Sequence, residues 1–161
     1  MAASLEIQIG SLLSKRGLKL ALAESCTGGL VGNRITDVSG SSEYFLGGVV
    51  AYAYQAKVDL LSVSWDILNS KGAVSHETVM EMARGARKTF HADIAASISG
   101  IAGPTGGTSD KPVGTVWIGI AAPDGEWTRE FHFNGSRAQI KSSAADAALQ
   151  SLLDYLEGKL S

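Results

Sequence analysis

Hydrophobic residues along this chain fall alternately at helical spacing and in short continuous runs. Leu5, Ile9 and Leu13 recur at helical spacing, and Gly17 follows as a stop signal, which predicts an N-terminal helix. Short apolar runs bounded by polar residues predict buried strands at 18–23, 46–53, 92–101 and 115–122. Amphipathic spacing predicts further helices at 28–37, 56–63, 76–91 and 137–160, with a short helical turn at 65–68.

The last strand and the caps complete this pattern. Pro123-Asp124-Gly125 predicts a hairpin turn, and residues 127–133 alternate apolar and polar as a half-exposed antiparallel strand does. Ser75 and Ser136 precede apolar helical runs and are expected to cap them. Strands that alternate with helices and then pair as a hairpin predict an α/β fold, with a mixed parallel and antiparallel sheet covered by helices on both faces. Residues 1–161 contain no repeat or linker, so a single domain is expected.

Composition narrows the function classes. The 161 residues are 45% hydrophobic with a formal net charge of −2, and this balance gives no sign of a nucleic-acid partner. No apolar run reaches the roughly 20 residues that a spanning helix needs, so no membrane partner is expected. The first ten residues lack a basic leader pattern, which favours a cytoplasmic location. With one cysteine and three scattered histidines, no metal site is expected.

The stretch from Ser99 to Val116 has the composition of a ligand-binding loop. It contains five glycines and two prolines between two apolar strands. Glycines let the backbone bring its N–H groups close to a ligand, and prolines stiffen the loop. The alternative is a flexible connector. Neither GxxxxGK[ST] nor GxGxxG is present, so the common nucleotide loops are excluded.

Two further places carry candidate chemistry. The strand at 18–23 runs into Glu24-Ser25-Cys26-Thr27-Gly28-Gly29, where a helix start would present N–H groups to an anion. Ser25 and Thr27 are either helix caps or catalytic groups, and Cys26 is either a nucleophile or a small packed residue. Lys57 follows the strand at 46–53, where partial burial would favour its neutral form and make it a base. The alternative is a solvated surface lysine. Arg137, at a helix start, is either a phosphate clamp or an exposed arginine.

Several long motifs, in order along the whole chain, closely resemble the CinA carboxy-terminal domain family. They are AESCTGG (23–29), DVSGSSEYFLGGVVAY (37–52), GAVS (72–75), SGIAGPTGG (99–107) and KPVGTVW (111–117). The resemblance implies a three-layer α/β/α sandwich. It also implies the activity of the stand-alone members, which hydrolyse nicotinamide mononucleotide to nicotinate mononucleotide and ammonia without a cofactor.

The resemblance further implies a serine and lysine pair. We assign the nucleophile to Ser42 and the general base to Lys57, with Ser25 and Tyr52 beside them, and Ser25 or Thr27 as the alternative nucleophile. The residues expected to bind substrate are Thr27, Gly28, Ser41, Ser99, Gly100, Gly103, Thr105, Gly106, Gly107 and Arg137. A homo-oligomer is expected. Alternative functions are a non-catalytic nucleotide-binding module associated with competence and DNA damage, or an amidase acting on a related pyridine nucleotide.

Overall fold

The computed structural model describes residues 2–160, whose strands form one five-stranded sheet in the order β2-β1-β3-β4-β5. The strands are β1 (Leu20–Glu24), β2 (Phe45–Val50), β3 (Ile94–Gly100), β4 (Thr115–Ala122) and β5 (Gly125–His132). β1 is parallel to both β2 and β3, whereas β4 is antiparallel to β3 and to β5. The predicted mixed sheet is confirmed.

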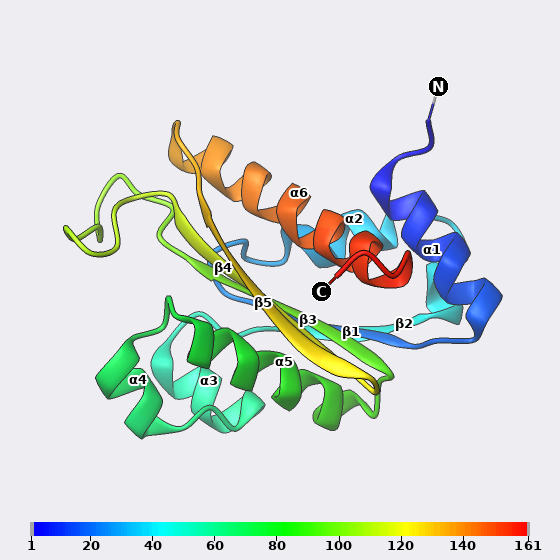
Figure 1. The fold of residues 1–161 in the computed structure, drawn as a ribbon, viewed down its shortest axis with the longest axis horizontal. Coiled ribbons are helices and arrows are strands. Elements are labelled where there is room, and N and C mark those ends of the chain that lie inside the picture. The colour runs from blue at the N-terminus through cyan, green and yellow to red at the C-terminus, as the bar shows by residue number, and fades with distance from the viewer. Residues whose placement is uncertain (1, 161) are drawn as a thin grey trace.

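Helices cover both faces of this sheet (Figure 1). One layer holds α1 (Leu5–Arg16), α2 (Leu30–Thr36) and α6 (Arg137–Leu156). The other holds α3 (Tyr54–Leu61), α4 (Trp65–Lys71) and α5 (His76–Phe90). A short 3-10 helix, η1 (Ser41–Glu43), precedes β2. The three-layer α/β/α sandwich is therefore confirmed.

The two faces of β1 have different cores. Leu20 and Leu22 belong to the large apolar cluster that includes residues of α1, α2 and α6, whereas Ala21 and Ala23 belong to a smaller cluster with residues of α3, α4 and α5. On this second side the helices pack closely, because a Cβ on Gly85 of α5 would lie 1.9 Å from the carbonyl oxygen of Leu61. Only glycine allows that approach.

The predicted elements are all present, and their ends shift by a few residues. β4 has the predicted bounds, and the side chains of Ser75 and Ser136 accept hydrogen bonds from Thr78 N and Gln139 N as caps. β2 ends at Val50 rather than at residue 53, and α3 begins at Tyr54. The short turn expected at 65–68 is a seven-residue helix, α4.

The chain leaves the carboxyl ends of β1 and β2 in opposite directions. From β1 it passes through α2 to β2 at one edge of the sheet, and from β2 it returns through α3, α4 and α5, on the other face, to β3 on the far side of β1. In open α/β sheets, ligands bind outside the carboxyl ends of the strands at such a switch point. A ligand site is therefore expected at the carboxyl end of β1.

Candidate active site

Lys57 is a fully buried lysine beside the end of β1. Lys57 is 1% exposed, and it is the largest of the residues whose side chains the fold buries completely. Its Nζ lies 3.0 Å from Ser25 Oγ, 2.9 Å from Ala51 O and 3.0 Å from Tyr52 O. Burial lowers the pKa of Lys57 from 10.5 to about 8. Of the two predicted alternatives, the buried lysine is therefore confirmed, and the solvated surface lysine is wrong.

These three contacts suit a neutral amine as well as an ammonium group. An ammonium can donate to all three oxygens. A neutral amine can donate to Ala51 O and Tyr52 O and accept from the Ser25 hydroxyl with its lone pair. The site therefore holds both protonation states of Lys57 without moving a partner, which is what a proton acceptor requires.

Strand alternation brings Ser25 to the same face of the sheet as Lys57. Along β1 the side chains of Glu24 and Ser25 leave on opposite faces, with Ser25 toward the α3 side. Backbone bonds fix both residues, because Ser25 N donates to Ile98 O at 2.9 Å and Ala51 N donates to Glu24 O at 2.9 Å. The register of β1 with β3 ends at Glu24 opposite Ile98, and one residue further along each chain come Ser25 and the buried Ser99.

The structure does not bring Ser42 to Lys57, and the nucleophile assignment is corrected accordingly. Ser42 is an exposed residue of η1, before β2, where Leu20 N donates to Tyr44 O at the start of β1. Lys57 follows the other end of β2, and six strand residues span about 20 Å. Ser41 lies with Ser42 at this far end and is likewise not part of the site.

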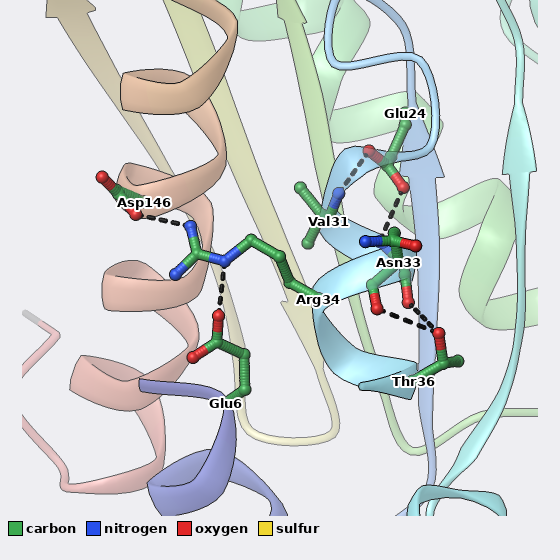
Figure 2. Close-up of polar contacts among 8 residues, drawn as sticks. Glu6, Glu24, Val31, Asn33, Arg34, Thr36 and Asp146 are labelled. Carbon is green, nitrogen blue, oxygen red and sulfur yellow. Dashed lines mark hydrogen bonds and ion pairs between the residues drawn. The ribbon is translucent and has the colours of Figure 1, made fainter. Parts of the chain in front are cut away.

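The start of α2 is occupied by the protein's own carboxylate. Glu24 is 3% exposed, and its Oε1 accepts hydrogen bonds from Thr27 Oγ1 and from the N–H groups of Gly29 and Val31. Its Oε2 accepts from Gly32 N, and Figure 2 shows the carboxylate against the first turn of α2. The expectation that this helix start receives a substrate anion is therefore wrong, because Glu24 already supplies the negative charge.

Cys26 is a packed residue and not a thiolate. It is 5% exposed, and burial raises the pKa of its thiol to about 12. A thiol with so high a pKa is a poor nucleophile near neutral pH. Of the two readings for Cys26, the small packed residue is the one that the fold supports.

Arg137, Tyr52 and Gly103 lie together next to Lys57, which donates to Tyr52 O. Arg137, the first residue of α6, donates from Nη1 to Gly103 O at 2.7 Å and from Nη2 to Tyr52 Oη at 2.9 Å. These bonds tie α6, the end of β2 and the base of the 101–114 loop together. Three of the predicted site residues, 85 and 34 positions apart along the chain, thus lie together.

The tip of the 101–114 loop is exposed to solvent. Thr105, Gly106 and Gly107 are exposed, and Gly100 and Gly103 form its base beside β4 and Val113. On the α4 side, the ammonium of Lys111 donates to Lys71 O. The loop is therefore held from both helical layers while its tip faces solvent.

Sequence reasoning missed two residues of this region. Glu24 was seen only as a strand end, although a carboxylate directly before a glycine-rich helix start is a signal of capping. Lys141 lies one helical turn after Arg137 on α6, and its Nζ is 3.8 Å from the position that a Cβ on Gly28 would take. Leu30, Arg137, Ala138 and Lys141 line a hollow of about 440 Å³.

Residues 2–160 contain neither a metal-binding cluster nor a helix that could span a membrane. No group of three or more histidine, cysteine, aspartate or glutamate side chains in this range is arranged to hold a metal ion. Within the same range, no helix combines the length and apolar character needed to cross a bilayer.

Fold and site together define an α/β/α sandwich with a buried serine and lysine pair at its switch point. The family model described as "CinA C-terminal domain" matches residues 2–156. The chain therefore belongs to the CinA C-terminal domain family.

Named relatives agree with this assignment. A putative competence-damage inducible protein of Halothermothrix orenii is 52% identical over 155 residues, which cover 96% of this chain and 38% of that protein. A CinA-like protein of Geotalea daltonii is 49% identical, with 91% of this chain and 35% of that protein covered. The chain thus spans little more than a third of the length of these relatives.

Solved structures share the whole fold. A CinA superfamily protein from Klebsiella pneumoniae superposes with a TM-score of 0.92 at 33% identity, covering 96% of both chains. The competence/damage inducible protein CihA of Agrobacterium tumefaciens gives 0.89 at 34% identity, covering 98% of both.

Proposed function

We propose that this chain is an amidohydrolase that converts nicotinamide mononucleotide to nicotinate mononucleotide and ammonia, with Ser25 as nucleophile and Lys57 as general base. The observation that carries the proposal is the buried Lys57 Nζ, 3.0 Å from Ser25 Oγ, with its pKa lowered to about 8. A hydroxyl is a weak nucleophile until a neighbouring base accepts its proton. The substrate itself is taken from the family resemblance.

The proposed reaction is acyl transfer in two steps. Neutral Lys57 accepts the proton of Ser25 as Oγ attacks the carboxamide carbon, and the resulting ammonium returns a proton to the departing nitrogen. Ammonia leaves and an acyl ester forms on Ser25. Water, deprotonated by Lys57, then attacks the ester, and the proton returns to Ser25 as nicotinate mononucleotide is released.

The hollow lined by Arg137 and Lys141 offers two cations for one phosphate group. Arg137 and Lys141 lie one turn apart on α6 and line the same hollow, together with Leu30 of α2. The N–H groups at the start of α2 are not available to this phosphate, because the carboxylate of Glu24 accepts their hydrogen bonds. A guanidinium and an ammonium bind phosphate by charge-assisted hydrogen bonds. A mononucleotide is therefore the substrate class that this arrangement favours.

An ammonia-release assay tests the proposal directly. Purified protein is given nicotinamide mononucleotide, nicotinamide riboside or nicotinamide, each with and without EDTA. We expect turnover of the mononucleotide that EDTA does not reduce, and far slower release from the two compounds without phosphate. Tight binding of the mononucleotide without ammonia release would instead support the alternative of a non-catalytic nucleotide-binding module.

A further inference from the structure

The backbone N–H groups after Ser25 divide into two sets. Between Gly28 and Gly32 every amide has an acceptor: Glu24 takes those of Gly29, Val31 and Gly32, and turn carbonyls take those of Gly28 and Leu30. The amides of Cys26 and Thr27 donate to no other residue within 2–160, and the Cys26 amide meets only its own thiol. Both residues are at most 5% exposed. Buried amides without a partner are rare in folded proteins and call for an explanation.

Their position supplies one. Cys26 and Thr27 come one and two residues after Ser25, on a turn closed by the Gly28 N to Ser25 O hydrogen bond of 3.1 Å. In hydrolases that attack through serine, the N–H group of the residue after the nucleophile commonly binds the oxygen that becomes negative. We propose that the amides of Cys26 and Thr27 bind the substrate's carbonyl oxygen, and that Glu24 is the positioning residue that holds the turn carrying these two amides. This inference rests on the proposed function for the identity of the amide substrate.

Glu24 can do this because it faces the other side of the sheet from Ser25. Its carboxylate accepts four hydrogen bonds that would otherwise need acceptors from the turn itself. It contacts neither Ser25 Oγ nor Lys57 Nζ, so it acts through the turn and not on the reacting atoms. A glutamine in its place would turn an amide NH2 toward an N–H donor on one of its two sides, and the turn would have to shift.

Glu6 provides a matched control for the same chemical change. It is a nearly buried carboxylate on α1 that pairs with Arg34 of α2, and Arg34 also pairs with Asp146 of α6, as Figure 2 shows. Glu6→Gln thus removes a charge that holds helices together, away from Ser25. A loss caused by general destabilisation would appear in both variants.

The experiment compares wild type, Glu24→Gln, Glu6→Gln and Ser25→Ala. The kcat and KM are measured with nicotinamide mononucleotide and with its thioamide analogue, whose sulfur is a weaker acceptor. We expect Glu24→Gln to lower kcat by about 10²- to 10³-fold with KM within a few-fold, the loss typical of a weakened oxyanion site. The ratio of amide to thioamide turnover should fall toward one in Glu24→Gln and stay unchanged in Glu6→Gln.

Each other outcome also decides the question. Equal kcat values in Glu24→Gln and Glu6→Gln would overturn the inference. If Glu24→Gln does not fold, as judged by circular dichroism, the wild-type ratio decides, and a value near one would overturn the inference.

A separate substrate separates the inference from the proposed function. With p-nitrophenyl acetate we expect a nitrophenolate burst that Ser25→Ala abolishes and Glu24→Gln slows more than Glu6→Gln does. Such a burst, from a wild type that releases no ammonia from the mononucleotide, would sustain the inference and overturn the substrate assignment. A burst that Glu24→Gln leaves as fast as in Glu6→Gln would overturn the inference alone.

Discussion

One serine-containing turn follows β1 and another precedes β2, and they differ in how far their serines are buried. The turn after β1 contains Ser25, buried and 3.0 Å from the amine of Lys57. The turn before β2 contains Ser41 and Ser42, and Ser42 is exposed. Both turns combine serine with glycine, and both belong to motifs of the family. The comparison teaches that a serine becomes a candidate nucleophile through the strand end it occupies, because β1 and β2 are parallel and Lys57 of α3 bonds residues that follow their carboxyl ends.

The strongest way to break this comparison is to remove the Ser25 hydroxyl. Ser25→Ala should lower kcat for ammonia release by at least about 10⁴-fold, because the acyl ester can no longer form, while KM changes little. Steady-state kinetics with nicotinamide mononucleotide measures both. Near-normal turnover in Ser25→Ala would contradict the assignment of Ser25 as nucleophile and favour Thr27 in that role.

Removing the amine tests the other half of the pair. Lys57→Met should lower kcat by about 10³-fold, the scale of a lost general base. In the wild type, kcat/KM should rise with pH around a midpoint near 8, because only the neutral amine accepts a proton and burial lowers the pKa of Lys57 to about 8. A flat profile between pH 6.5 and 9 would contradict the role of Lys57 as base.

The burial of Lys57 should also appear in the pH dependence of stability. The pKa of Lys57 in the folded chain is about 8, below the ordinary lysine value of 10.5, so between these pH values the unfolded chain holds a proton that the folded chain lacks. Stability from this group therefore rises with pH across that window and is lowest below it. The wild type should gain about 3 kcal/mol in free energy of unfolding relative to Lys57→Met from pH 8 to 10.5. Urea denaturation at several pH values measures the difference, and parallel curves would show that Lys57 is not desolvated.

For Arg137 the expected effect is smaller. Arg137→Ala removes one charge-assisted phosphate contact and the ties to Gly103 and Tyr52, and should raise KM by about 10- to 30-fold. Arg129→Ala, on exposed β5 with Asp154 as its ion-pair partner, is a suitable control and should leave KM within twofold. Equal effects from the two variants would indicate a general charge effect.

The smallest effect belongs to the other turn. Ser42→Ala should change kcat and KM by less than about twofold, because its hydroxyl lies at the amino end of β2, away from Lys57. Ammonia release from the variant and the wild type, assayed side by side, measures this. A large loss of kcat in a folded Ser42→Ala would contradict the conclusion that Ser42 lies outside the active site.

Much of the fold follows from local patterns. Helical spacing and caps such as Ser75 and Ser136 are properties of neighbouring residues, so they predict the elements well. Ends are less determined, as β2 shows, because the residues after Val50 are still apolar and only the start of α3 ends the strand. The role of Glu24 was missed although its four partners lie only three to eight residues further on, because a glutamate at the end of a buried strand does not by itself show that its carboxylate turns to the helix start.

The amino-acid sequence by itself determined the order and type of the elements, the mixed sheet, the family and the importance of Lys57 after an apolar run. These features depend on interactions between residues close together in the sequence or on short sequence motifs. Only the tertiary structure decided which serine meets that lysine. Ser25 and Lys57 are 32 residues apart, and strand order, strand direction and side-chain alternation together bring them within hydrogen-bonding distance.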